Sequence, residues 1–345
     1  MAAAPPTPLV AVGSYTAVSG GRGPGITLFA LDPATGRLDP RGSHALDSPS
    51  YLLWHPELPV LYAVGETEYG TVTALRLCAD GTLQPLGTLP TGGADPCHLA
   101  LTADGRHLLC ANYSGGSLAV FALAEDGTLA GRTALVEHAG RGTDPDRQQG
   151  PHVHMAVPGP GADQFGAVDL GTDEIREYTL SGGVPRLRRT VRLPAGCGPR
   201  QLLRGEEADY VVGELDARVH VLPGRASGAE QPLPLRSAPT SARPGTNYPA
   251  HLRFSADRRF LYVSNRGVDT VTVLRTADLG PVGEFDCGGA WPRHFELIGD
   301  RLYVANQHSD TVSVLAADRV TGVLAQVGSV AVGSPACVAA RGVGG

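Results

Sequence analysis

The sequence predicts an all-β protein, a seven-bladed β-propeller of four-stranded antiparallel blades. Three observations support this prediction. Apolar stripes with helical spacing are almost absent from the chain. Short β-rich runs are instead separated by turn pairs, such as the Asp-Gly pairs at 80–81, 104–105 and 126–127. A similar unit then recurs about every 45 residues, and four short strands at this period are typical of propeller blades.

A proline marks the start of each unit, and these prolines are 43 to 55 residues apart: Pro49, Pro96, Pro151, Pro199, Pro249, Pro292 and Pro335. A first strand follows the proline, as at 98–101, 251–254 and 294–297. A second strand is expected at 61–64, 108–111, 210–212, 261–264 and 302–305. A third is expected at 71–75, 117–121, 174–178, 218–222, 270–274 and 311–315, and a weaker fourth closes each unit, as at 84–89.

The two ends of the chain predict how the ring closes. Six complete blades are expected at about 48–94, 95–150, 151–197, 198–248, 249–290 and 291–334. The N-terminal part supplies a second strand at 9–12, a third at 25–30 and a fourth, but no first strand. Residues 335–339 form a lone first strand. Residues 9–47 and 335–340 therefore complete a seventh blade, which closes 1–345 into one domain without free sheet edges.

Composition and charge exclude several classes of function. The net charge is −6, and all 28 basic residues are arginines without a basic stripe, so no nucleic-acid partner is expected. No 18-residue apolar span predicts a membrane helix. Residues 1–8 lack the basic and apolar regions of a signal peptide. The six cysteines form no C-x-x-C pair and mostly lie in apolar runs, which indicates reduced thiols in a cytoplasmic protein. A monomer is expected.

Blade geometry predicts that polar side chains gather at one mouth of the ring. The start of a first strand lies beside the end of the antiparallel second strand, and all blades point the same way around the axis. One set of rim positions therefore holds Ser50, Cys97, His98, His152, His154, Arg200, His251, Arg293, His294 and Ala336. The other holds Ser14, Glu66, Tyr113, Leu170, Glu214, Arg266 and Gln307. Many cations with few acids suit an anionic ligand bound by arginine. The opposite mouth is expected to carry only ordinary hairpin residues.

The segment 150–157 is the strongest local signal for a site. A polar, aperiodic stretch at 138–149 leads into His152 and His154, at the head of an apolar strand. At positions i and i+2 of a strand, both imidazoles would point to the same face. A structural histidine pair is one alternative. A zinc or iron site is another, because an H-x-H pair with an acid can bind either metal, but a third histidine at defined spacing is missing.

Other features have simpler explanations. Glu66 and Glu214 could form a buried ionic network with Arg266 or Arg293 instead of a site. The glycine-rich run at 20–25 precedes a strand and not a helix, so it is expected to be a hairpin loop without a phosphate-binding helix N-terminus. The chain has no G-x-S-x-G motif and no convincing Cys/His arrangement, so no covalent nucleophile is expected.

Short segments over nearly the whole chain also carry a family resemblance: GSYT (13–16), YAVGE (62–66), CANYSGG (110–116), RQQGPHVH (147–154), GPR (198–200), VGELD (212–216), VSNRG (263–267) and WPRHF (291–295). In their order and spacing they resemble the lactonase family of seven-bladed propellers. That family includes propeller-type 6-phosphogluconolactonases and is related to fungal carboxy-cis,cis-muconate cyclase. Gly65 and Gly213 depart from the asparagine that more often precedes each glutamate in the family, so the positioning amide is missing there.

The resemblance implies a site without cofactor or metal, in which His154, Glu214, Arg200 and Arg266 are catalytic. His152 is an alternative to His154. The predicted substrate-binding residues are His152, Arg293, Glu66, His98, His251, His294 and Gln307.

The expected function is hydrolysis of a sugar-acid lactone, foremost 6-phosphogluconolactone to 6-phosphogluconate. Such a reaction needs a base for water, donors for the oxyanion and a proton for the leaving alkoxide. His154 or Glu214 would be the base, Arg200 or Arg266 would stabilise the oxyanion, and Arg293 with the remaining arginine would bind the phosphate. The alternatives are a lactonising cyclase acting on a muconate-type dicarboxylate, and a non-catalytic scaffold. A scaffold should expose aromatic rings at the mouth, where only Tyr113 and Trp291 qualify.

Overall fold

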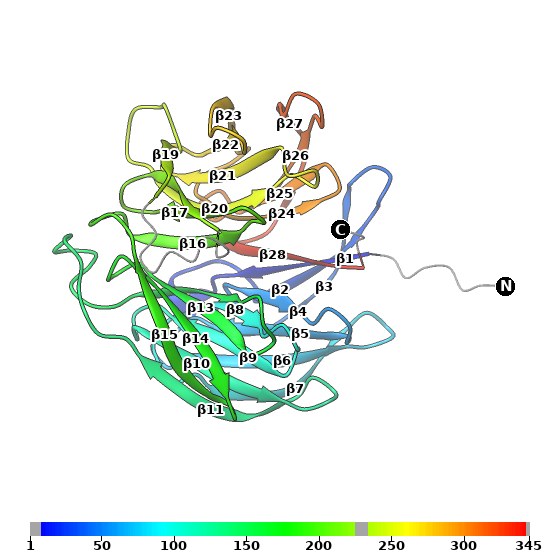
Figure 1. Ribbon diagram of the computed structural model, residues 1–345. Helices are drawn as coiled ribbons and strands as arrows, with labels where there is room; N and C mark the ends of the chain where they lie inside the picture. The colour runs from blue at the N-terminus through cyan, green and yellow to red at the C-terminus, as the bar shows by residue number, and fades with distance from the viewer. Residues whose placement is uncertain (1–7, 225–233, 343–345) are drawn as a thin grey trace.

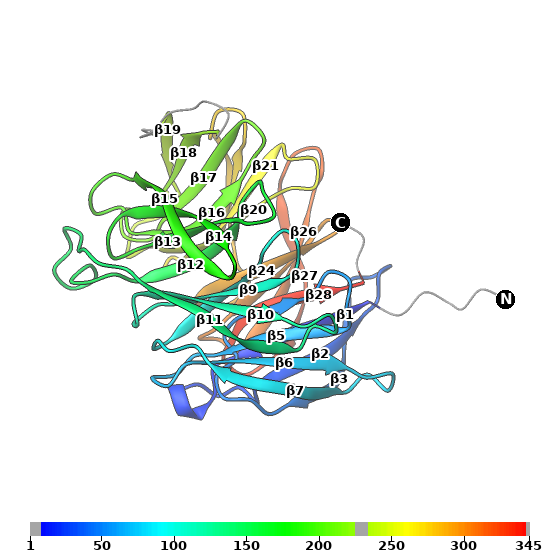
Figure 2. The same cartoon turned by 60° about the horizontal axis from the view of Figure 1, so that its bottom comes forward.

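Seven four-stranded antiparallel sheets surround a central channel in the computed structural model, which describes residues 8–224 and 234–342 (Figures 1 and 2). The innermost strands contact their neighbours in chain order, and β28 contacts both β24 and β4, so the ring is closed. The prediction of a seven-bladed propeller is thus confirmed. The signal-peptide expectation concerns residues 1–8, which lie outside the described residues except for the last.

Each sheet takes its strands in order from the channel outward. The innermost strands are β4 (Leu52–Trp54), β8 (Pro96–Leu101), β12 (Val153–Pro158), β16 (Pro199–Arg204), β20 (Tyr248–Phe254), β24 (Pro292–Ile298) and β28 (Pro335–Arg341). The second strands are β1 (Leu9–Ser14), β5 (Val60–Gly65), β9 (His107–Asn112), β13 (Gln164–Asp169), β17 (Ala208–Gly213), β21 (Phe260–Arg266) and β25 (Arg301–Asn306).

The outer half of each blade is built from the remaining strands. The third strands are β2 (Ile26–Leu31), β6 (Thr71–Leu77), β10 (Ser117–Leu123), β14 (Glu174–Ser181), β18 (Arg218–Pro223), β22 (Thr270–Arg275) and β26 (Thr311–Ala317). The fourth are β3 (Leu38–His44), β7 (Leu83–Pro90), β11 (Leu129–Glu137), β15 (Val184–Arg192), β19 (Arg236–Pro239), β23 (Pro281–Asp286) and β27 (Leu324–Ala331). Within the described residues the helical structure is limited to the short 3₁₀ helix η1 (Ala17–Ser19).

Burial falls from the channel side to the rim, which explains the apolar pattern of the sequence. Every residue of β5 and β21 is buried, because neighbouring blades cover both faces of these strands. Most residues of β3 and β27 are instead exposed. The second strands are therefore continuous apolar runs, whereas the fourth strands are polar and give the weakest sequence signal.

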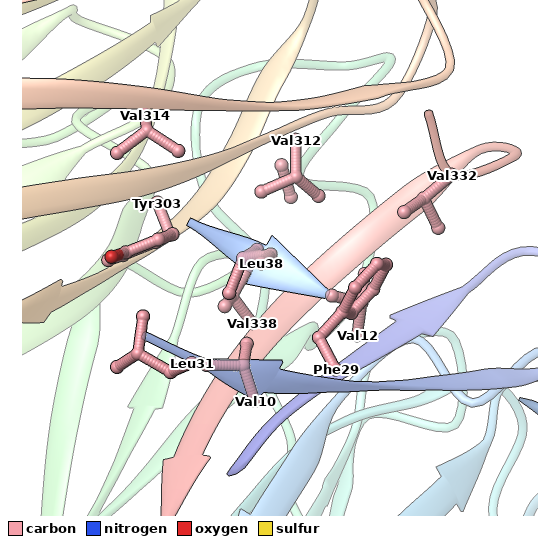
Figure 3. Close-up of a cluster of buried hydrophobic side chains, with 11 residues drawn as sticks. Val10, Val12, Phe29, Leu31, Leu38, Tyr303, Val312, Val314, Val332 and Val338 are labelled. Atoms are coloured by element: carbon pink, nitrogen blue, oxygen red, sulfur yellow. The ribbon is translucent and has the colours of Figure 1, made fainter. Parts of the chain in front are cut away.

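The closing blade joins the two ends of the chain, as predicted. β28 pairs antiparallel with β1, with Val10 opposite Ala340 and Val12 opposite Val338. In Figure 1 the red β28 runs beside the blue β1. Figure 3 shows the core between this blade and its neighbour, with these labelled side chains: Val10, Val12, Phe29, Leu31, Leu38, Tyr303, Val312, Val314, Val332 and Val338. Full burial of one such aliphatic or aromatic side chain contributes roughly 1.5–3 kcal/mol.

Three smaller expectations concern the glycine-rich run, the cysteines and membrane-spanning helices. The glycine-rich run lies in the loop between η1 and β2, so it precedes a strand as predicted. All six cysteines are free thiols. The described part of the chain contains no helix with the length and apolar character needed to span a membrane.

Candidate active site

A repeated irregularity of the innermost strands positions the polar side chains at the mouth. Pro199 pairs with Gly213 and Gln201 with Val212, so Arg200 has no partner in the ladder. The same skip leaves out Cys97, His154, Arg293 and Ala336 in other blades. A bulge of this kind turns the extra side chain away from the normal alternation.

The bulge also corrects one argument made from the sequence. β12 begins only at Val153, so His152 precedes the strand, and His154 is its unpaired bulge residue. The alternation of side chains along a strand therefore does not relate these two histidines. They nevertheless meet the same ring, because the ring centroids of His152 and His154 lie 4.5 and 5.4 Å from that of Tyr113.

Glu214 lies at the centre of an arginine cluster that joins two neighbouring blades and the loop between β11 and β12. Its Oε2 accepts hydrogen bonds from Arg200 Nη1 (2.7 Å) and Arg266 Nη2 (2.6 Å). Its Oε1 accepts one from Arg147 Nη2 (2.6 Å). The side chains of Glu214, Arg200 and Arg266 are only 4%, 7% and 6% exposed, whereas that of Arg147 is 36% exposed. Three of the four predicted catalytic residues therefore contact one another directly, and the fourth, His154, contacts Arg200.

His154 contacts the cluster through a ring nitrogen. Arg200 Nη1 donates to His154 Nε2, and His154 Nδ1 lies 3.8 Å from Cys97 Sγ. Burial, reinforced by the Arg200 charge, holds the pKa of His154 well below its usual range. The imidazole is therefore neutral at physiological pH, and its Nε2 lone pair already accepts a hydrogen bond from a guanidinium.

The charges of the cluster determine its protonation. Burial by itself would raise the pKa of Glu214, but the Arg266 and Arg200 charges outweigh it and hold that pKa well below the usual range. Burial lowers the pKa of Arg266 to about 9, against the attraction of Glu214. At neutral pH Glu214 is therefore an anion surrounded by cations.

Arg147 is the member of the cluster that the sequence analysis did not assign. It lies in the loop between β11 and β12, donates to Tyr113 Oη (3.3 Å) and has its guanidinium carbon 5.8 Å from the Tyr248 ring centroid. Fully buried Gln148 anchors this loop, because its Nε2 donates to Leu170 O and Asp173 Oδ1, both at 2.8 Å. A signal was available, since Arg147 opens the segment RQQGPHVH that contributed to the family resemblance.

The glycine before Glu214 does not leave an empty space. A Cβ at Gly213 would lie 2.2 Å from Asp216 Oδ1, so the Asp216 carboxylate fills the space beside the glycine. Asp216 in turn accepts from the Arg218 backbone N–H (3.2 Å) and contacts His220 Nε2 (2.7 Å). The Glu214 backbone N–H donates to Gly198 O (2.8 Å). Glu214 is thus positioned by its backbone and three arginines, without an amide side chain at position 213.

A second acid–cation group lies on the other side of the mouth. Both Glu66 oxygens accept from Tyr15 Oη (2.9 Å), Ser50 Oγ donates to Oε2, and Arg293 Nη2 lies 3.9 Å from Oε1. Arg293 Nη1 also donates to Gln307 Oε1 (3.4 Å). Burial raises the pKa of Glu66 despite the opposing Arg293 charge. The two glutamates at this mouth are therefore shifted in opposite directions.

Half-buried aromatic rings form the wall above these charges. His152 stacks on Tyr113, and its Nδ1 lies 3.1 Å from Tyr113 O. The Trp291 ring has the Arg266 guanidinium carbon 5.5 Å from its centroid and the Tyr248 ring centroid at 6.3 Å. His152 and Gln307 thus lie at the mouth as predicted, while their role as ligand contacts stays a prediction.

The other three predicted binding histidines lie deeper. His98, His251 and His294 are 4%, 7% and 6% exposed and line a channel cavity of about 520 Å³. Burial lowers the pKa of His98 to about 3 and takes the pKa values of His251 and His294 well below their usual range. Neither nitrogen of His251 has a hydrogen-bond partner within the described residues. We call these three residues the histidine layer.

The far end of the channel corrects the expectation of ordinary hairpin residues there. Arg253 and Glu296 form an ion pair on the cavity wall, with side chains 41% and 17% exposed. The histidine layer separates this pair from the mouth. His98 and His294 line both the cavity and a small hollow that also contacts Glu66, His154 and Arg200.

That small hollow measures about 20 Å³, which is enough for one water molecule and not for a sugar ring. A substrate must therefore lie above it, between the aromatic wall and the charged groups. A wider hollow of about 970 Å³ lies at the turns that follow β16 and β20, at the opposite mouth. The arginines in its wall are engaged locally, as in Arg258–Glu206 (2.8 Å) and Arg275–Asp278 (3.1 Å), so it has no equivalent of the Glu214 cluster.

The geometry contains no arrangement suited to the metal alternative. In the described ranges, no group of three or more His, Cys, Asp or Glu side chains is placed to bind a metal ion. Arg200 and Arg147 bind the groups that would otherwise be the nearest ligands, His154 and Glu214.

Comparisons with known proteins agree with the fold. A 6-phosphogluconolactonase of Bacillus subtilis is 30% identical over 340 residues, which cover 95% of this chain and 96% of the relative. The solved periplasmic gluconolactonase of Pseudomonas aeruginosa is 30% identical with a TM-score of 0.89, covering 98% of this chain and 99% of that one. A solved protein of Lactobacillus plantarum is 28% identical with a TM-score of 0.88, covering 97% and 99%.

The profile of one protein family, described as lactonase, seven-bladed β-propeller, matches residues 9–340. This match runs from β1 to β28 and includes the whole rim. The chain belongs to the lactonase family of seven-bladed β-propellers.

Proposed function

We propose that the protein hydrolyses a sugar-acid lactone, with 6-phosphoglucono-1,5-lactone as the leading substrate. The observation that carries the proposal is the buried Glu214 carboxylate at the polar mouth of the channel, where Arg200 and Arg266 hold it beside His154. The Bacillus subtilis relative named 6-phosphogluconolactonase and the Pseudomonas aeruginosa gluconolactonase support lactone opening as the reaction.

Glu214 is the proposed base for the attacking water. Of the two candidates, His154 already uses Nε2 as an acceptor for the buried Arg200 guanidinium. Glu214 is ionised. Its Oε1 binds Arg147, whose side chain is half-exposed and not buried. His154 is then a positioning residue that fixes the Arg200 guanidinium.

Arg200 and Arg266 are the proposed donors to the oxyanion that forms when water attacks the lactone carbonyl. Backbone carbonyls hold both guanidiniums in place, because Arg200 Nε donates to Ala250 O (2.8 Å) and Arg266 Nε to Tyr248 O (3.0 Å). Donors fixed before the reaction stabilise developing charge without reorganisation. Each guanidinium has five N–H groups, so donation to Glu214 leaves others for the substrate.

Glu66 is the proposed proton donor to the leaving ring oxygen. Two acids with oppositely shifted pKa values are typical of an acid–base pair, and here the pKa of Glu66 is raised while that of Glu214 is lowered. In this scheme water adds to C1, its proton goes to Glu214, the C1–O5 bond breaks, and O5 takes a proton from Glu66. Arg293 contributes positive charge for the phosphate.

The test is a pH-stat assay of lactone opening by purified protein, corrected for spontaneous hydrolysis. We expect saturable acid release with 6-phosphogluconolactone that persists when a chelator is present. A rate equal to the spontaneous one would refute the proposal. Loss of activity with chelator would refute the metal-free scheme alone. Carboxymuconate serves as the second substrate, because its turnover without lactone opening would support the cyclase alternative.

A further inference from the structure

We infer that Arg147 is an exchangeable arginine, which leaves Glu214 to bind the phosphate of the substrate and so activates the base. This inference rests on the proposed hydrolase function and adds to it the residue that discriminates phosphorylated from unphosphorylated lactones. It follows from an asymmetry among the three arginines that surround Glu214.

The two oxygens of Glu214 have different partners. Oε2 binds Arg200 and Arg266, whose side chains are buried and fixed by backbone carbonyls. Oε1 binds Arg147, whose side chain is 36% exposed. Within the part of the chain that the structure describes, the side-chain hydrogen bonds of Arg147 both come from Nη2, to Glu214 Oε1 and Tyr113 Oη. Its Nε and Nη1 therefore stay available to a ligand.

Release of Arg147 needs only rotation of its side chain. The loop itself is held, because Gln148 is fully buried and the Arg147 backbone N–H donates to Asp144 Oδ1 (3.0 Å). Gln148 Oε1 also accepts from the Thr143 backbone N–H (3.0 Å). A fixed backbone below a half-exposed arginine lets the guanidinium change partners without moving the loop.

The charge at the mouth selects the new partner. Four guanidiniums (Arg147, Arg200, Arg266 and Arg293) face two carboxylates (Glu66 and Glu214), which leaves two positive charges in excess when both acids are ionised and three when Glu66 carries its proton. A phosphate monoester carries about −1.5 to −2 charges at neutral pH and offers the oxygens that a guanidinium fork binds in bidentate fashion. An unphosphorylated sugar lactone supplies no such charge.

Departure of Arg147 has a direct consequence for Glu214. Its Oε1 becomes free to accept a proton from water, and loss of one neighbouring cation raises the pKa of Glu214 toward its usual range, which makes it a stronger base. Anion binding and base activation are thereby one event, and Arg147 acts as the specificity-determining residue of the site.

The test compares wild type, Arg147→Gln and Arg147→Lys on 6-phosphoglucono-1,5-lactone and on glucono-1,5-lactone. For Arg147→Gln we expect kcat/KM on the phosphorylated lactone to fall about 10- to 100-fold, the size of a lost charge-assisted contact. On the unphosphorylated lactone, which has no phosphate to draw Arg147 away from Glu214, we expect it to rise, because the variant frees Oε1 and lets the pKa of Glu214 return toward its usual range. The acid limb of the kcat profile on that substrate should move to higher pH, because Glu214 must be ionised to act. Arg147→Lys should retain part of the discrimination.

Arg253→Gln is the matched control, since Arg253 is also a half-exposed arginine paired with a largely buried glutamate, at the other end of the channel. It should leave the ratio of the two substrates unchanged. An equal loss of both activities in Arg147→Gln, or no loss of either, would overturn the inference. If wild type opens neither lactone, the hydrolase proposal fails and calorimetry decides. Preferential binding of 6-phosphogluconate over gluconate that is lost in Arg147→Gln supports phosphate capture, and equal binding by both proteins overturns it.

Discussion

The Glu214 cluster and the histidine layer occupy the same channel, yet they are opposite in chemistry. At the mouth, buried charges are paired, as Glu214 is with three arginines. One step deeper, three imidazoles are kept neutral by burial, and His251 lacks a hydrogen-bond partner among the residues described. A buried ion pair is weak support for stability, because desolvation offsets its attraction. The comparison therefore agrees with the catalysis proposed at the mouth and predicts acid sensitivity in the layer.

The largest expected effect is that of Glu214→Gln. It removes the proposed base and leaves Arg200 and Arg266 buried without a counter-charge, so kcat should fall about 10³-fold and unfolding free energy by about 3–5 kcal/mol. Lactone assays and urea denaturation measure the two effects. The control is Glu296→Gln in the deeper part of the channel, which should retain activity. Equal activity losses in both variants would remove the distinction between the two regions.

His154→Ala should lower kcat about 10²-fold, because the Arg200 guanidinium loses the imidazole that it contacts. His154→Gln should recover part of that loss, since an amide can accept the same hydrogen bond. If Gln is no better than Ala and the acid limb of the rate profile disappears, His154 is itself the base and Glu214 is not.

The histidine layer predicts acid lability. The folded pKa of His98 is about 3 and those of His251 and His294 are also depressed, whereas the unfolded value is about 6.5. Between these values the unfolded chain binds more protons, so the stability present above pH 6.5 is lost as pH falls, by up to about 1.4 kcal/mol per pH unit for each histidine. His251→Phe should stay within about 1 kcal/mol of wild type at pH 7 and flatten the loss measured between pH 6.5 and 4. An unchanged slope would contradict this prediction.

Tyr113→Phe should have the smallest effect. The ring that stacks on His152 is retained, and only the hydroxyl that accepts from Arg147 at 3.3 Å is lost. We expect kcat/KM on the phosphorylated lactone to change about fivefold or less, which corresponds to one neutral acceptor. A loss as large as that of Arg147→Gln would mean that Tyr113, and not Arg147, carries the discrimination.

The sequence predicted what repeats. Seven prolines defined the blades. The antiparallel pairing of first and second strands then placed Arg200 near Glu214, although no local motif links the two residues. The ring closure followed from the incomplete ends. These inferences succeed because a propeller converts sequence period into spatial position.

Features that do not repeat were not predictable from the sequence. Arg147 lies in an aperiodic loop and meets Glu214 across 67 residues, so no strand pattern predicts the contact. The direction of the His154 side chain was predicted from the alternation of side chains along a strand, but the bulge in β12 interrupts that alternation. Arg253 and Glu296 come from two different blades and form an ion pair at the far end of the channel, where only hairpin residues were expected.

Closure of the ring by β28 also has a consequence for biosynthesis. The inner strand that pairs with β1 lies at residues 335–341, so the propeller stays an open array until those residues leave the ribosome. During that time Val10, Val12 and Phe29 lack Val338, the residue of this core cluster that β28 contributes (Figure 3). Newly made chains with an exposed apolar edge are prone to aggregate. Substitutions in β28 should therefore lower the yield of soluble protein during expression more than they alter turnover by the molecules that mature.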